Sequence, residues 1–217
     1  MSRSRRDPTR TTAEVISVGR ELHEAGLVAG VAGNLSALLG DERMLITVAG
    51  SHLGRLETED LVETSLSGQV DASGRASSEL PFHRAAYRAD RRVRGVVHVH
   101  APALIAIGLR GDDIEDALPE VGIATGSIVV IEPTESGSEE LGRKVGEAVA
   151  LGGRVILLHR HGAVAVGSTL RDAADRIELA ELSAYAVLLA ENEGQAITRR
   201  RLRRLTRRLT ERLAASA

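Results

Sequence analysis

The chain has 217 residues, enough to bury one sizeable hydrophobic core. It contains no cysteine, which excludes disulfides and thiolate metal ligands and fits a cytoplasmic location. Aromatic residues make up 1% of the chain, which disfavours binding to nucleic acid by base stacking. No run of 18 apolar residues is present, so we expect no membrane partner.

The net charge of −2 conceals a basic C-terminal end, because residues 196–217 carry eight arginines and one glutamate. The charge pattern and the Arg-rich start divide the chain into three parts. We expect a flexible tail over residues 1–10, one domain over residues 11–195, and a basic amphipathic helix over residues 196–217.

The first half of the chain predicts short strands bracketed by two helices. An apolar face that ends at Gly26 predicts a helix over residues 11–25. A second helix begins near Ser77, with a serine cap and an early proline, and runs to about residue 89. Strands are expected near 35–39, 44–48 and 60–66.

In the second half, strands and helices alternate. Strands are expected over 93–99, 128–131, 155–159 and 163–166, and helices over 102–109, 138–151 and 170–193. Strands that outnumber helices early and alternate with them later favour a layered α/β fold over a helical bundle.

Two His-x-His tripeptides contain four of the seven histidines. His98-Val99-His100 ends one apolar run, and His159-Arg160-His161 ends another. Alternate residues of a strand point to one face, so a pair on a strand can direct two imidazoles to one point. Two such pairs on separate predicted strands indicate a metal site of three nitrogens with an open position. The alternative is that these histidines are hydrogen-bonded residues on strand faces.

Glu79 is the candidate acid–base residue, since a carboxylate beside a divalent cation can move a substrate proton. Its alternative role is to complement the dipole of the helix that begins there. Exposed amides and hydroxyls at Ser77 and Ser78, with turns at Gly33-Asn34 and Ala49-Gly50, suggest a phosphorylated substrate. His83 and Tyr87 follow on the same helix face as packing or supporting residues.

Four motifs, in order, resemble the class II aldolase and adducin-head family and, within it, the fuculose-phosphate aldolases. They are Gly33-Asn34-Leu35-Ser36, Ile46-Thr47-Val48-Ala49-Gly50, Ser77-Ser78-Glu79 through to His98-Val99-His100, and Leu158-His159-Arg160-His161-Gly162. The resemblance covers residues 11–192. It implies a three-layer αβα domain around a largely antiparallel central sheet, and a homotetramer with active sites between subunits.

The resemblance also implies roles for individual residues. His98, His100 and His161 would bind one zinc ion per subunit, with another divalent metal as the alternative, and His159 would not. Glu79 would act as acid–base residue and touch the metal. Gly33, Asn34, Ala49, Gly50, Ser77 and Ser78 would hold the substrate phosphate.

The implied reaction is reversible cleavage of a ketose 1-phosphate to dihydroxyacetone phosphate and an aldehyde, through a zinc-stabilised enediolate. Residues 101–126 hold no tyrosine where these aldolases place an acid, and Glu120 is the nearest ionisable substitute. A dehydratase, decarboxylase or epimerase acting on a related phosphosugar is therefore the alternative. A non-catalytic adducin-like module is disfavoured, because it has no need of metal ligands.

The C-terminal arginines flank a leucine stripe at Leu202, Leu205, Leu209 and Leu213. The interpretation we favour is a helix docked on the tetramer, with solvated arginines. A membrane-surface or nucleic-acid role, and attraction of phosphate esters to the site, are the alternatives.

Overall fold

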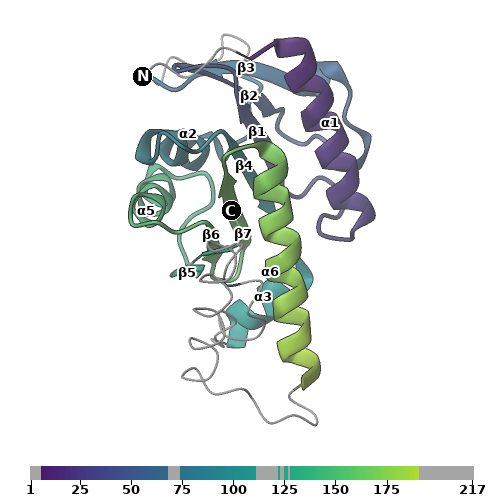
Figure 1. The fold of residues 1–217 in the computed structure, drawn as a ribbon, viewed down its shortest axis with the longest axis vertical. Helices are drawn as coiled ribbons and strands as arrows, with labels where there is room; N and C mark the ends of the chain where they lie inside the picture. The colour runs from purple at the N-terminus through teal and green to yellow at the C-terminus, as the bar shows by residue number, and fades with distance from the viewer. Residues whose placement is uncertain (1–5, 68–73, 111–121, 123–124, 127, 191–217) are drawn as a thin grey trace, which may run out of the picture.

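The computed structural model describes residues 6–67, 74–110, 122, 125–126 and 128–190. Its strands form a seven-stranded sheet in the order β3-β2-β1-β4-β7-β6-β5 (Figure 1). All neighbours are antiparallel except β5 and β6, which confirms a largely antiparallel sheet. The strands are β1 (Asn34–Leu38), β2 (Arg43–Thr47), β3 (Leu61–Ser65), β4 (Gly95–Val99), β5 (Ile128–Ile131), β6 (Val155–Leu158) and β7 (Gly162–Gly167).

The helices lie close to where the sequence predicts them. They are α1 (Pro8–Glu24), α2 (Leu80–Ala89), α3 (Pro102–Arg110), α5 (Glu139–Ala150) and α6 (Leu170–Ala190), with short 3-10 turns η1 (Leu53–Arg55) and η2 (Thr58–Asp60).

Helix α1 begins earlier than predicted. The Asp7 side chain accepts a hydrogen bond from the Thr9 amide, and Pro8 occupies the first turn, where its missing N–H costs nothing. Residues 8–10 therefore belong to a helix and not to the predicted tail. The predicted basic helix over 196–217 lies outside the described residues.

Two clusters of buried side chains lie on opposite faces of the sheet, as alternation along each strand requires. Val97 and Val99 join the cluster under α1, α3 and α6, whereas Val96 joins the cluster under α2 and α5. Figure 1 shows α2 and α5 together on one side and α1 and α6 on the other. The three-layer αβα arrangement itself stays a prediction.

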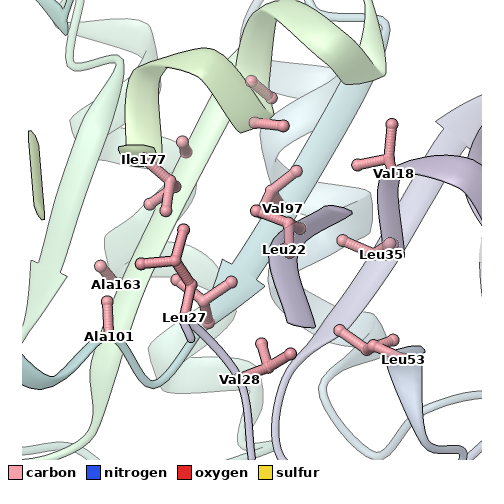
Figure 2. Close-up of a cluster of buried hydrophobic side chains, with 14 of the residues drawn as sticks. Val18, Leu22, Leu27, Val28, Leu35, Leu53, Val97, Ala101, Ala163 and Ile177 are labelled. Carbon is pink, nitrogen blue, oxygen red and sulfur yellow. The ribbon is translucent and has the colours of Figure 1, made fainter. Parts of the chain in front are cut away.

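The cluster in Figure 2 is built from aliphatic side chains, among them Val18, Leu22, Leu35 and Ile177. Full burial of one such side chain contributes about 1.5–3 kcal/mol. The second cluster holds Phe82, whose ring is fully buried. Within the described ranges, no helix is both long and apolar enough to cross a bilayer.

Strand β4 positions the site because it lies in the middle of the sheet. It pairs with β1 on one side and β7 on the other. Antiparallel pairing brings the end of β4 to the start of β7, where Val99 lies opposite Ala163. Side chains that follow β4 and side chains that precede β7 therefore meet at one edge of the sheet.

Candidate metal centre and active site

Three of the predicted ligands meet at this edge. His98 lies on β4, fully buried, and His100 follows two residues later on the same face. His161 belongs to the tight turn that joins β6 to β7. Their ring centroids are 4.9–5.2 Å apart in every pair. Among the described residues these three form a group whose donor atoms all lie within 4.8 Å of one another.

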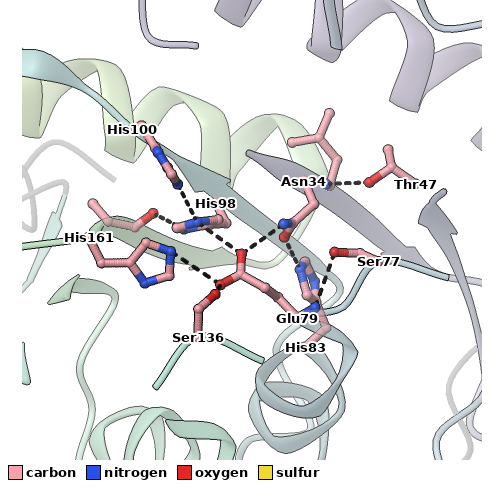
Figure 3. A network of polar contacts seen from close by, with 11 residues as sticks. Asn34, Thr47, Ser77, Glu79, His83, His98, His100, Ser136 and His161 are labelled. Carbon is pink, nitrogen blue, oxygen red and sulfur yellow. Dashed lines mark hydrogen bonds and ion pairs between the residues drawn. The ribbon is translucent and has the colours of Figure 1, made fainter. Parts of the chain in front are cut away.

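The Glu79 carboxylate faces this cluster (Figure 3). Its Oε2 lies 3.0 Å from Nε2 of His98, and its Oε1 lies 3.2 Å from Nε2 of His161. Glu79 is the residue that precedes α2, and its own side chain makes no capping bond to that helix. The alternative role of complementing the helix end is therefore secondary, because the carboxylate points to the histidines.

The donor set fits a divalent cation. Nδ1 of His98 lies 3.0 Å from the carbonyl oxygen of Ala163, which only accepts, so Nδ1 carries the ring hydrogen. Nε2 of His98 faces the other donor atoms of the cluster, 3.1 Å from Nε2 of His100 and 3.0 Å from the Glu79 carboxylate. Nitrogen and carboxylate donors gathered this closely, without thiolate, suit a divalent metal.

The electrostatics of the site favour the neutral forms of His100 and His161. Burial, with the neighbouring His98 and His161, lowers the pKa of His100 to about 4. Burial also lowers the pKa of His161. Burial acts to raise the pKa of Glu79, but hydrogen bonds from His98, Asn34 and Ser136 outweigh it and hold that pKa well below its usual range. The site thus combines two histidines that stay neutral with an ionised carboxylate.

Two uncharged side chains fix the carboxylate. The Asn34 amide nitrogen donates to Oε2 at 2.9 Å, and the Ser136 hydroxyl donates to Oε1 at 2.7 Å. Sequence reasoning missed Ser136, which lies in the loop between β5 and α5. In that loop the sequence signals only the helix cap at Ser138. Ser136 reaches Glu79 because β5 lies beside β6, and this pairing cannot be read from the residues of the loop.

The predicted phosphate residues come from two segments that lie side by side. Val48 bridges to Ala76, and the Ser77 amide donates to the Thr47 carbonyl. This brings Ala49 and Gly50 close to Ser77 and Ser78. The amide of Ala49 donates to the Arg75 carbonyl, so this N–H is already bonded within the protein.

The other two predicted phosphate residues lie at the start of β1. A Cβ on Gly33 would come within 2.7 Å of the His98 carbonyl oxygen, so glycine lets this turn lie against β4. Both polar atoms of the Asn34 side chain already have partners, because its nitrogen donates to Glu79 and its oxygen lies beside His83. A phosphate role for these six residues stays a prediction.

One expectation about the histidines is wrong. His159 and His161 do not lie on a strand, because the tripeptide forms the turn between Leu158 and Gly162, which pair directly. Arg160 has φ of 62°, a left-handed conformation that reverses the chain. His161 reaches the cluster, whereas the Nε2 of His159 lies 3.3 Å from Nε of Arg160. Glu120 lies outside the described residues.

Comparison with known proteins agrees with this geometry. The family model described as Class II Aldolase and Adducin N-terminal domain matches residues 13–188. The chain belongs to this family. The match confirms the resemblance that the four motifs carry.

Individual members differ in their reactions. A 3-oxo-tetronate 4-phosphate decarboxylase of Pectobacterium atrosepticum is 36% identical over 83% of this chain and 84% of its own. YgbL of Klebsiella pneumoniae, described as an aldolase, epimerase or decarboxylase, superposes with a TM-score of 0.82 at 30% identity, over 91% of this chain and 98% of its own. The L-fuculose-1-phosphate aldolase of Thermus thermophilus superposes with a TM-score of 0.77 at 32% identity, over 87% and 100%. The family is shared, and the reaction varies within it.

Proposed function

We propose that this chain is a metal-dependent decarboxylase of a 3-oxo sugar-acid phosphate of the 3-oxo-tetronate 4-phosphate kind. The main support for a metal-dependent reaction is that the Glu79 carboxylate contacts two of the three clustered histidines. The 36% identity to a decarboxylase of such a substrate supports this reaction over aldol cleavage. Aldol cleavage of a ketose 1-phosphate, which the motifs alone favoured, becomes the second candidate, supported by the likeness to a fuculose-phosphate aldolase.

The two reactions make the same demand on the site. Decarboxylation breaks the bond between the carboxyl carbon and carbon 2, carbon dioxide leaves, and the electron pair stays on carbon 2 beside the carbonyl group. A proton then adds to carbon 2, which yields dihydroxyacetone phosphate. Aldol cleavage leaves an electron pair on the equivalent carbon of the same three-carbon phosphate. A site that stabilises this charge can serve either reaction.

Each part of the site has a role in this scheme. His98, His100 and His161 hold the cation, for which zinc is our first choice and another divalent metal the alternative, since imidazole binds several of them. When bound, the cation supplies Lewis-acid stabilisation of the negative charge on the substrate carbonyl oxygen. Glu79 carries the proton to and from the carbon beside that carbonyl. Asn34 and Ser136 hold its two oxygens in place.

We place the substrate phosphate at the paired segments 47–50 and 76–78, where the turn at Gly50 lies beside the exposed Ser78. We also propose that the active protein is a homotetramer with sites between subunits, and that a group from a neighbouring subunit completes each site.

A product assay separates the candidates. Purified protein is incubated with 3-oxo-tetronate 4-phosphate and, separately, with a panel of ketose 1-phosphates. Dihydroxyacetone phosphate is measured with a coupled enzyme, and carbon dioxide is measured independently. We expect equal amounts of both products from the sugar-acid phosphate. Dihydroxyacetone phosphate with an aldehyde and no carbon dioxide would instead establish the aldolase. Absence of turnover and of bound metal would favour a non-catalytic module.

Substitution of the acid–base residue tests its role. We expect Glu79→Gln to lower turnover by about 10²–10⁴-fold, the usual contribution of a positioned acid or base. The amide keeps the size of the side chain and can still accept from Ser136. Turnover within threefold of the unsubstituted protein would exclude Glu79 from proton transfer.

A further inference from the structure

Behind Glu79, on the side away from the metal ligands, lies a row of buried polar side chains that the scheme above leaves unexplained. Asn34 Oδ1 lies 2.6 Å from His83 Nε2, and His83 Nδ1 lies 2.7 Å from the Ser36 hydroxyl. The Ser36 hydroxyl lies 2.8 Å from the Tyr87 hydroxyl. His83 and Ser36 are fully buried, so no solvent molecule can replace a missing partner in this row.

The fold explains why these residues meet. Asn34 and Ser36 are two apart on β1, so they share a face of the sheet. That face is also the face of His98, which lies directly opposite Asn34 on β4. His83 and Tyr87 are four apart on α2, so they share the helix face that covers this part of the sheet.

The hydrogen atoms in this row can be assigned from donor and acceptor chemistry alone. An ionised carboxylate only accepts, so Asn34 turns its NH₂ group to Glu79 and its carbonyl oxygen to His83. That oxygen accepts, so His83 Nε2 carries a hydrogen. A neutral ring has one such hydrogen, and its Nδ1 therefore accepts from the Ser36 hydroxyl, which in turn accepts from Tyr87.

The orientation of the Asn34 amide matters for Glu79. A reversed amide would place its carbonyl oxygen against a carboxylate oxygen at hydrogen-bond distance, and its NH₂ group against the N–H of His83. Both contacts would be repulsive, and a buried unsatisfied group costs about 1–3 kcal/mol. The hydrogen on His83 Nε2 thus decides which atom Asn34 presents to Glu79.

We propose that His83 is a positioning residue: through its Nε2 hydrogen it locks the Asn34 amide in the orientation that holds the Glu79 carboxylate for proton transfer. Ser36 keeps the hydrogen of the His83 ring on Nε2, because the Ser36 hydroxyl donates to Nδ1. The inference rests on the proposed function only in taking Glu79 as the acid–base residue. Stacking of the ring on Phe82, with centroids 4.7 Å apart, keeps the imidazole in place.

The tautomer can be observed without any activity. In the full chain with ¹⁵N-labelled histidine, NMR shows which ring nitrogen of His83 carries the hydrogen, and His83→Gln assigns the signal by its disappearance. We expect a hydrogen on Nε2 and none on Nδ1 at pH 7. A hydrogen on Nδ1, or on both nitrogens, would overturn the proposal.

A matched pair of substitutions tests the consequence. The amide of His83→Gln reaches the position of Nε2 and can donate to Asn34, whereas the amide of His83→Asn reaches only the position of Nδ1. Both variants lose the ring that stacks on Phe82, so both lose that packing. We expect kcat to fall about 10–100-fold in His83→Asn, the usual effect of losing a supporting hydrogen bond. In His83→Gln we expect kcat within about threefold of the unsubstituted protein, and KM little changed in both.

Equal losses of kcat in the two variants, with folding shown by thermal unfolding, would mean that the ring only packs, and would overturn the proposal. If neither variant folds, the NMR measurement on the unsubstituted protein decides. If the unsubstituted protein turns over no sugar phosphate, the proposed function fails, while the tautomer still supports or overturns the inference.

Discussion

The two histidine tripeptides have the same spacing, yet they reach the site in different ways. His98 and His100 lie at the end of a strand and direct both rings to one point. His159 and His161 lie in a turn, and only His161 joins the cluster. Alternation on a strand sends both side chains of a pair the same way, whereas a turn separates them. The spacing of ligands therefore predicts a shared site only when the backbone between them is extended.

Removing the ligand from the turn should have the largest effect. We expect His161→Ala to lose bound metal on purification and to lose more turnover than the roughly 10–100-fold of a supporting residue. His159→Ala, two residues away, is the matched control. It should keep bound metal and turnover within about twofold of the unsubstituted protein. Metal analysis and the product assay check both variants. Similar losses in the two would contradict the division between these histidines.

Adding one methyl group at Gly162, where the turn of His161 meets the end of β4, should have the second largest effect on metal binding. A Cβ at Gly162 would collide with the Val99 carbonyl oxygen and lie 3.1 Å from the rings of His98 and His100. We expect Gly162→Ala to reduce the free energy of unfolding by about 1–3 kcal/mol and to weaken metal binding. Gly40→Ala is the control, since its Cβ would meet nothing within 4 Å. Denaturant unfolding and metal titration measure both effects.

Acid should reveal the buried His83, which supports the carboxylate from behind. Burial lowers the pKa of His83 to about 3 from 6.5, although the nearby Glu79 carboxylate opposes this. Below pH 6.5 His83 binds a proton in the unfolded chain but stays neutral in the folded chain. The free energy of unfolding therefore decreases as the pH is lowered.

The expected loss from His83 is about 2 kcal/mol at pH 5, and it continues to grow down to about pH 3. Denaturant unfolding of chelator-treated protein at pH 7 and pH 5 measures it. His83→Gln should be less sensitive to acid by that amount. An equal pH dependence of the free energy of unfolding in the two proteins would show that His83 binds its proton as readily in the folded chain as in the unfolded chain.

The smallest expected effect concerns the turn itself. Arg160 adopts φ of 62°, which costs an L-residue about 1–2 kcal/mol. Glycine removes that cost but adds freedom to the unfolded chain. We therefore expect Arg160→Gly to stabilise the protein by about 0.5–1 kcal/mol and raise Tm by about 1–4 °C. Unchanged turnover would show that the Arg160 side chain serves neither binding nor catalysis.

Much of the fold could be read along the chain, because each element depends on local patterns. Gly26 ends the first helical pattern, and α1 ends at Glu24, two residues before it. The Arg-rich start of the chain hides the beginning of α1, which the Asp7 cap and Pro8 place three residues before the predicted helix. His98, His100 and Glu79 were recognisable as chemical groups from their type, their spacing and the family motifs.

What the order of residues alone determined is which groups are available: imidazoles at 98, 100 and 161, an acid at 79, and no thiolate. Tertiary structure decided which atoms of these groups meet. The antiparallel pairing of β4 with β7 brings His161 beside His98, and β5 beside β6 delivers Ser136 to Glu79. The row from Asn34 through His83 to Ser36 exists only because α2 packs on β1. Hydrogen bonds act over about 3 Å, and only packing can bring segments distant in the chain within that reach.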